Sequence, residues 1–353
     1  MARRVRRSNG PLDLREQAIL RAVIEEYVAT ATPVGSVALV ERYGLGVSSA
    51  TVRAILAELE AAGYLDQPHT SAGRVPTDHG YRYYVSSIVD SPPLSPVEEL
   101  MIRHQFGQVE AASEHWFRLA ATTLAGLTHA AGLATPAKPR AARVRRVDLV
   151  AIQDRLASLI LVLREGSIKQ ILLSLDEAAD QAALSAAAER LNRLFTDQTA
   201  RQIDATLVRF DPDDPANILV RKVAERIARS MREFDTALIE EFFSDGLLNV
   251  MEAPEFAQSD KLRRVFSALE NRAWLGELLR GVASSGRVQV FIGGENEPPE
   301  MHDVSLVLAP YGRPGRAVGV VGVLGPTRMS YAHAIGTVRF VGGLMNELTD
   351  QLS

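Results

Sequence analysis

The sequence predicts a multidomain α/β (α+β) protein, with a helical N-terminal domain followed by a mixed region of strands and helices. Residues 14–63 place apolar side chains at helical spacing, and strand-like runs rich in β-branched residues occur at 147–175 and 287–325. A polar block with helical periodicity separates the two strand-like runs. A length of 353 residues is enough for two or three domains of this kind.

Composition limits the compartment and the kinds of site that the chain can form. The chain contains no cysteine, which excludes disulfides and thiolate metal sites and fits a reducing cytosol. No apolar segment follows the charged N-terminus, and no apolar run approaches the length of a membrane span. We therefore expect a cytoplasmic protein that makes no contact with a membrane.

The net charge of −4 is unevenly distributed along the chain. Residues 1–90 hold ten basic and ten acidic side chains, whereas residues 176–262 hold ten basic and eighteen acidic ones. The acidic segment is therefore not expected to lie along a polyanion. Four N-terminal arginines could either contact phosphates or stay solvated, and the sequence leaves both interpretations open: Arg3, Arg4, Arg6 and Arg7.

Residues 36–63 have the pattern of a helix-turn-helix. A helix of two turns over 36–43, with Ser36 as its expected cap, is followed by a glycine-containing turn and a longer helix that Ser48 caps. One face of the longer helix is an apolar stripe, and the other begins with small side chains and Arg53. This combination suits a helix that enters the major groove of DNA, although an ordinary helical hairpin has the same periodicity. The stripe consists of Val52, Ile55, Leu56 and Leu59.

A β-hairpin is predicted directly after the longer helix. Residues 64–76 read as a strand, a polar loop and a return strand, which in this position form the wing of a winged helix. His69 and Arg74 are expected near its tip, where a wing meets the DNA backbone, although His69 could equally be a loop residue without a role. The residues predicted to contact DNA are Ser36, Ser48, Ser49, Ala50, Thr51, Arg53, His69, Thr70, Ser71 and Arg74.

Two further helical segments flank this unit. A first helix over 14–30 is expected to begin at the cap Asp13, and a helix after Thr77 carries three tyrosines that we expect to pack against the winged domain. The next helical stretch, 97–133, follows a proline-rich segment. Its expected core residues are Leu100, Phe106, Phe117, Leu124 and Leu127.

Residues 46–85 resemble the N-terminal domain of the bacterial HrcA heat-shock repressor family, most strongly in PHTSAGRVPTDHGYR (68–82). IGGEN (292–296) and GPTRMSY (325–331) resemble the C-terminal half of that family, so the resemblance covers nearly the whole chain. Positions 54–55 depart from it, because Ala-Ile stands where a polar pair is expected. The resemblance implies a sequence-specific repressor of heat-shock (chaperone) operons. Such a repressor binds an inverted-repeat operator in double-stranded DNA as a homodimer, and a GroEL-type chaperonin modulates its activity.

The patterns and the resemblance together predict the domain boundaries. A winged helix-turn-helix domain spans 1–90, and 91–96 is a linker. A GAF-like domain is expected from 97–175 together with 261–353, interrupted by an inserted helical dimerisation domain at 176–260. The insert is acidic and rich in leucine, isoleucine and phenylalanine, which favours a role in contacts with a second copy.

No enzyme activity is expected. The chain lacks a P-loop, an HExxH motif and a GxSxG elbow, and His104, His115 and His129 are too scattered for a helical metal pair. We therefore predict no cofactor and no metal. The alternative function is a metabolite-responsive winged-helix regulator that senses a small ligand through its GAF-like domain, since domains of this type often hold a ligand on the sheet.

Overall fold

The structure is a computed structural model. It describes most residues of the chain, with short gaps between the described ranges. The described residues are 12–69, 73–88, 94–108, 113–139, 141–164, 166–211, 215–236, 243–256, 259–313 and 317–351. The chain forms two compact units, and the first combines Met1–Ala137, Glu241–Gly312 and Gly319–Ser353. The second combines Lys138–Glu240 and Arg313–Val318.

Three helices at the start of the first unit confirm the predicted helix-turn-helix. They are α1 (Leu14–Thr30), α2 (Ser36–Tyr43) and α3 (Ser49–Ala61). The Asp13 carboxylate caps α1 as expected, and the Ser48 hydroxyl accepts a hydrogen bond from the Thr51 N–H at the start of α3. All four residues of the predicted apolar stripe on α3 are buried, so the opposite face of that helix is the one turned outward.

A buried carboxylate fixes α2 against α1. Glu26 of α1 is 7% exposed, and it accepts hydrogen bonds from the Arg42 guanidinium and, at 3.4 Å, from the Tyr43 hydroxyl. Burial raises the pKa of Tyr43, and the negative charge of Glu26 raises it further. The last turn of α2 is therefore attached to the C-terminal part of α1 by a charged contact as well as by apolar packing.

The predicted wing is a short antiparallel hairpin. Its strands are β1 (Leu65–Asp66) and β2 (Val75–Pro76), with Leu65 opposite Pro76. Val34 adds a further bridge, exchanging two backbone hydrogen bonds with Arg74 at 2.8 and 2.9 Å. The chain then enters α4 (Asp78–Tyr83) and a π-helical turn, Tyr84–Ile88, and this segment buries Tyr81 and Tyr84.

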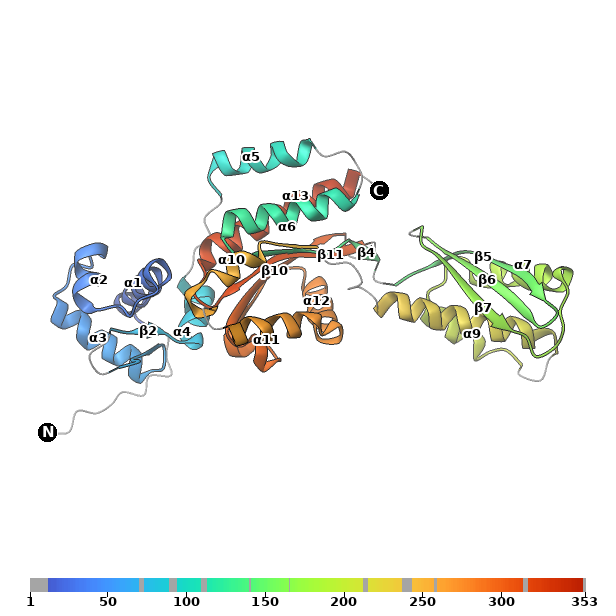
Figure 1. Cartoon of the computed structure of the whole chain (residues 1–353), viewed down its shortest axis with the longest axis horizontal. Helices are drawn as coiled ribbons and strands as arrows, with labels where there is room; N and C mark the ends of the chain where they lie inside the picture. Colours follow the sequence, from blue (N-terminus) through green and yellow to red (C-terminus); the bar gives the residue numbers. More distant parts are fainter. Residues whose placement is uncertain are drawn as a thin grey trace. The chain divides into compact units, whose positions relative to one another are not determined.

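The rest of the first unit is built on an antiparallel sheet in the order β8-β3-β11-β10-β9. Helices α6 and α13 cover one face, and α12 packs on the other beside α11 (Figure 1). The strands are β3 (Ala131–Ala134), β8 (Phe243–Asp245), β9 (Gln289–Ile292), β10 (Val304–Gly312) and β11 (Ala317–Pro326). The helices are α5 (Pro96–Gly107), α6 (Ser113–Thr128), α10 (Leu247–Met251), α11 (Ser259–Glu270), α12 (Arg272–Ser285) and α13 (Tyr331–Gln351).

Helix α5 differs from the sequence prediction in the face that it buries. Ile102 and Phe106 are buried, but Leu100, expected in the core, is 71% exposed. The expected linker 91–96 ends in ordered structure, since Leu94 is buried and Ser95 forms a capping box with Glu98 at the start of α5. Residues 91–93 lie outside the described ranges.

The second unit packs helices on one face of a three-stranded antiparallel sheet. Strands β5 (Val144–Gln153), β6 (Leu156–Leu163) and β7 (Ile168–Ser174) are joined in sequence as two hairpins, as predicted. Helices α7 (Gln181–Phe195), α8 (Ala200–Leu207) and α9 (Pro215–Thr236) share one buried cluster with the inner face of the sheet. The short strand β4 (Lys138–Pro139) pairs with Ala317 and Val318.

The compact units divide the chain at positions other than the predicted 176 and 260. Strands β5 to β7, expected in the domain that surrounds the insert, belong with α7 to α9, because Leu159 and Leu161 are buried against Leu191 and Phe195. At the other end, β8, α10 and α11 belong to the first unit, where β8 completes the sheet beside β3. The physical reason is that the inner face of β5–β7 needs the helices to cover it.

Close packing of α6 on β3 predicts the effect of a substitution at Gly132. A Cβ atom there would lie 2.0 Å from the carbonyl oxygen of Ala121 and 3.0 Å from the backbone nitrogen of Ala125, both in α6. Gly132→Ala should therefore lower the free energy of unfolding by roughly 1–3 kcal/mol. Urea denaturation followed by circular dichroism measures this loss.

Gly126 in the same helix provides the matched control. Apart from its chain neighbours and the backbone of its own helix, no atom lies within 4 Å of the position of its Cβ, so Gly126→Ala removes backbone freedom without a clash. It should raise the free energy of unfolding by roughly 0.5–1 kcal/mol. Equal behaviour of the two variants would contradict the close approach of α6 to β3.

Candidate nucleic-acid interface

The first turn of α3 presents small polar and basic side chains to solvent. Ser48, Ala50 and Arg53 are exposed, while Ser49 and Thr51 are half-buried. The Ser48 hydroxyl lies 3.0 Å from the Thr51 hydroxyl and 3.2 Å from the Thr51 backbone nitrogen. These residues and the N-terminus of the helix form a surface of low bulk with several donors, as a helix entering the major groove requires.

Arg53 is the exposed cation of this surface. In the described ranges, no hydrogen bond or ion pair to another protein group engages its guanidinium. The side chain lies one turn into α3, opposite the buried stripe that includes Val52 and Leu56. A guanidinium in this position keeps all five N–H donors available for a base edge or for phosphates.

Arg74, predicted to contact the DNA backbone from the wing, has a partner within the protein. Its guanidinium lies 2.7 Å from the Glu60 carboxylate of α3, and its side chain is only 17% exposed. Its backbone is paired with Val34, at the loop end of β2. The bridge to Val34 and the ion pair with Glu60 hold Arg74 against α3 and the segment before α2. Arg74 therefore stabilises the attachment of the wing to α3.

The other predicted contact residues fall into three groups. Ser36 is a correction: it is the first residue of α2, Gly35 occupies the cap position, and the Ser36 side chain is buried. His69 is exposed on the wing, as expected. Thr70 and Ser71, like Arg3, Arg4, Arg6 and Arg7, lie outside the described residues.

Sequence reasoning did not predict the role of two arginines in the motifs that carry the resemblance. Arg82 of α4 bonds to Glu295, and Arg328 bonds to Glu255 and to the backbone of α1. The sequence did contain one signal for this role. In motifs 68–82 and 325–331, the arginine lies within three residues of a tyrosine that is buried, Tyr81 or Tyr331. The partners lie more than 200 residues away in sequence for Arg82, so the spacing of residues could not identify them.

A small apolar cavity lies between the sheet and α11 and α12 of the first unit. It is lined by Leu133, Thr135, Leu269, Leu275, Leu279, Leu308 and Val320 and encloses a volume of about 10 Å³. This is the space of a single water molecule, whereas pockets for small organic ligands enclose roughly 300–1,000 Å³. The cavity gives no support to the alternative of a metabolite sensor.

Two searches of the described residues concern other kinds of site. In these ranges, no group of three or more His, Asp or Glu side chains is arranged to hold a metal ion. None of the described helices combines the length and the apolarity that crossing a bilayer requires.

A helix-turn-helix followed by a β-hairpin, with an exposed polar first turn on its second helix, defines the class of winged-helix proteins. Comparisons with known proteins identify the family of the chain. Residues 114–335 match the family model described as the HrcA protein C-terminal domain. The chain belongs to the HrcA family of heat-inducible transcription repressors, and it is a regulator of transcription, not an enzyme.

Curated relatives of this family align over almost the full chain. The heat-inducible transcription repressor HrcA of Roseiflexus castenholzii is 42% identical over 340 residues, covering 96% of this chain and 94% of the relative. The protein of the same name from Herpetosiphon aurantiacus is 42% identical over 343 residues, covering 97% and 96%. The one from Dehalococcoides mccartyi is 35% identical over 339 residues, covering 96% of each.

One solved structure shares the fold. It is described as the crystal structure of a hypothetical protein and matches with a TM-score of 0.57 at 20% identity, covering 97% of this chain and all of the other. At this level of identity, the match shows the arrangement of elements and carries no information on function. The multidomain α/β fold class is confirmed.

The contrast between Arg53 and Arg74 predicts two different phenotypes. If Arg53 contacts a base edge, Arg53→Ala should cost roughly 1–3 kcal/mol of binding to the preferred site and much less on random DNA. Its melting temperature should not change, because the side chain makes no described contact. Gel-shift titrations on both DNAs, with a thermal melt, measure these effects.

Arg74→Ala is the matched control for loss of one arginine from the same domain. It should lower the melting temperature because it leaves Glu60 without its partner, while the slope of affinity against salt stays close to that of the wild type. A stable Arg74→Ala protein with a reduced salt slope would show that this guanidinium contacts phosphate instead. Equal losses for Arg53→Ala on both DNAs would assign Arg53 to a phosphate.

Proposed function

We propose that this repressor binds an inverted-repeat operator as a homodimer, with one α3 helix in each half-site. The observation that carries the proposal is the exposed first turn of α3, where Ser48, Ala50 and Arg53 face solvent while the stripe behind them is buried. Membership of the HrcA family supports the class of target, the operons of heat-shock chaperones. Occupation of such an operator blocks access of RNA polymerase to the promoter.

We infer dimerisation from the small surface of a single winged helix. A single winged helix contacts few bases and binds weakly on its own. Two copies related by a two-fold axis contact two inverted half-sites, and their connection raises the effective concentration of the second site. The protein therefore needs a contact between copies that leaves α3 free.

The outer face of the β5–β7 sheet is the surface that we assign to this contact. Helices α7 to α9 cover the inner face, whereas the outer face exposes large apolar side chains: Val150 at 43%, Ile152 at 48%, Ile168 at 66% and Leu172 at 62%. Ile160 and Val162 of the central strand lie between them, since Val162 pairs with Ile168. An exposed sheet face that carries several large apolar side chains is typical of a surface that packs against another protein.

The position of this sheet face in the chain supports the same assignment. The winged helix belongs to the first unit, whereas the second unit holds most of the acidic segment 176–262. Acidic surface is unfavourable next to DNA, so this unit suits a contact between copies better than a contact with DNA. Strand faces that pack on their own copy produce the self-complementary interface that two-fold symmetry requires.

The proposal also includes a chaperonin of the GroEL type as a partner, which the family resemblance supports. Operator binding should recover to a larger fraction after dilution from urea when the chaperonin and ATP are present than when they are absent. Gel shifts of the refolded protein measure the recovered fraction. Recovery that is complete without the chaperonin, over the growth temperatures of the cell, would remove this partner from the proposal.

Leu172→Glu tests the dimer contact without disturbing the core. The side chain is 62% exposed, so a carboxylate there should leave the protomer folded but place an unpaired charge in the sheet contact. We expect monomers in sedimentation velocity at micromolar concentration. Affinity for the inverted repeat should fall toward that for a half-site, a loss on the order of 10²-fold or more.

Val208→Glu is the control, because Val208 is 86% exposed and lies at the end of α8, away from the sheet. It should remain dimeric with full affinity. A Leu172→Glu protein that is still dimeric would place the contact elsewhere. The exposed apolar residues of α5, Val97, Leu100 and Met101, are then the next surface to test.

A further inference from the structure

The three motifs that carry the family resemblance meet at one interface inside the first unit. Helix α4 lies against the turn that follows β9, and the segment before α13 lies against both α4 and α1. We call this contact the interdomain interface, defined by Asp78, Arg82, Glu295, Arg328 and Tyr331. It joins the winged helix to the β-sheet body of the same unit.

One side of the interdomain interface is held by the carboxylate of Asp78 and the guanidinium of Arg82. Asp78 accepts a hydrogen bond from the backbone N–H of Gly294 at 2.9 Å. A Cβ at Gly293 would lie 2.3 Å from the same carboxylate, so this approach requires glycine. Arg82 donates from Nε to Glu295 at 2.6 Å, and its Nη2 donates to the second oxygen of Glu295 and to the Val290 carbonyl. The forked geometry fixes direction as well as distance.

The other side is held by Arg328. Its Nη1 donates to the carbonyl oxygen of Val28 at 2.7 Å, in the last turn of α1, and its Nε donates to Glu255 at 2.6 Å. A cation at the carboxyl end of a helix is favourable because the unpaired carbonyls there carry partial negative charge. Both side chains of the pair are largely shielded, with 16% and 23% exposed. The contact therefore ties the end of α1 to the sheet body.

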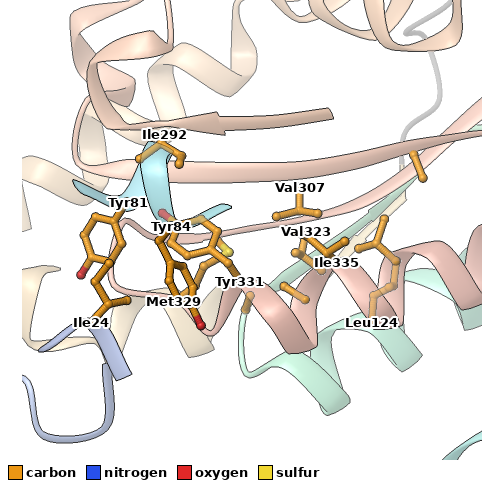
Figure 2. Packing of buried hydrophobic residues seen from close by; sticks show 14 of the residues in the cluster. Ile24, Tyr81, Tyr84, Leu124, Ile292, Val307, Val323, Met329, Tyr331 and Ile335 are labelled. Atoms are coloured by element: carbon orange, nitrogen blue, oxygen red, sulfur yellow. The ribbon is translucent and has the colours of Figure 1, made fainter. Parts of the chain in front are cut away.

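A cluster of buried apolar side chains accompanies these two polar contacts, and Figure 2 shows Tyr81, Tyr331, Ile24 and Ile292 in it. The rings of Tyr81 and Tyr331 are 5.5 Å apart, and both residues are almost fully buried together with Ile24 and Ile292. The Tyr331 hydroxyl lies 2.8 Å from that of Ser305 and donates to the Thr327 carbonyl at 2.7 Å. Burial raises the pKa of Tyr331 well above its usual value, so this hydroxyl stays neutral.

These contacts reach the elements that carry α3 but not its exposed face. Arg328 bonds to α1, Asp78 and Arg82 belong to α4, and α3 packs on α1 through its buried stripe. The exposed Ser48, Ala50 and Arg53 take no part. The interdomain interface can therefore affect how α3 is oriented on the body of its own protomer. It is not part of the exposed surface of α3.

We propose that the residues of the interdomain interface are positioning residues that set the spacer length of the inverted repeat that the repressor accepts. The inference rests on the proposed function, binding as a dimer to two half-sites. Each base pair added between half-sites moves the second site by about 3.4 Å and turns it by about 35°. A rigid attachment of α3 to the body removes one source of freedom between the two α3 helices, whereas a loose attachment lets each helix follow such changes.

The test compares spacer preference with half-site affinity. A half-site is first selected from a random double-stranded library with the wild-type protein, and inverted repeats are then built from it with a series of spacer lengths. The proteins are the wild type, Arg82→Ala, Arg328→Ala and the double variant. Arg103→Ala is the control, since Arg103 forms an exposed ion pair with Glu347 of α13, away from the interdomain interface.

The wild type and Arg103→Ala should favour one spacing by roughly tenfold over repeats altered by two or three base pairs. The double variant should favour it by no more than about threefold, while its affinity for an isolated half-site stays within about twofold of the wild type. A protein damaged in its fold would lose affinity for the inverted repeat and for the half-site together. A weaker spacer preference with unchanged half-site affinity therefore reports a change in the orientation of α3. If Arg328→Ala unfolds, Arg82→Ala carries the test, because the Arg82 and Glu295 side chains are each about one third exposed.

Two results would overturn the proposal. An unchanged spacer profile in the folded variants would show that the interdomain interface does not orient α3. A parallel loss of half-site affinity would show that it supports the winged helix itself. A wild-type protein that binds the inverted repeat no more tightly than the half-site would instead overturn the proposed dimeric function, which separates that failure from the other two.

Discussion

The burial of one face of α3 against α1 is the constraint on which the rest of the structure depends. Val52, Leu56 and Leu59 have almost no contact with solvent, and removal of such side chains from water contributes about 1.5–3 kcal/mol each. Because the helix can bury only one face, its first turn must present Ser48, Ala50 and Arg53 outward. The wing, the charged contact of α2 with α1 and the attachment of α1 to the sheet all hold this one helix in place.

The sheet of the first unit explains how a whole folded unit can be inserted into it. The chain leaves the sheet after β3 and returns at β8, and these two strands are antiparallel neighbours, with Ala134 opposite Phe243. The points of exit and return are therefore as close as the ends of a hairpin. An insert of any length can replace such a turn without breaking the hydrogen bonds of the sheet, since the cost of closing a longer loop grows slowly. The second unit then buries a core of its own.

The long-range contacts of α4 give a physical meaning to motifs that otherwise mark only family membership. Asp78 and Arg82 are more than 200 residues from their partners in sequence, yet each bonds to the same short turn after β9. Asn296 in that turn is buried and donates to the carbonyls of Gly293, Met301 and Val304. The turn is therefore rigid, and a rigid acceptor is what a forked guanidinium needs to fix an angle.

The sequence by itself determined the local elements of this protein. The apolar spacing on α3, the caps Asp13 and Ser48, and the alternation in β5 to β7 are local properties, because helix and strand periodicity is set by neighbouring residues. For the same reason, exposure of Arg53 could be predicted from its place opposite the stripe. The resemblance, carried by long motifs, then indicated the family that the comparisons confirm.

Only the tertiary structure decided which elements share a core and which charged side chains form ion pairs. The ion pair of Arg74 with Glu60 of α3 was not predicted, because no local pattern shows a contact between two elements. Strands β5 to β7 pack on α7 to α9 and not on the sheet of the first unit, because the cover of a sheet face depends on three-dimensional proximity. The pairing of Arg82 with Glu295 and of Arg328 with the end of α1 has the same origin. Periodicity determines which face of an element is buried, and only the folded chain determines what that face is buried against.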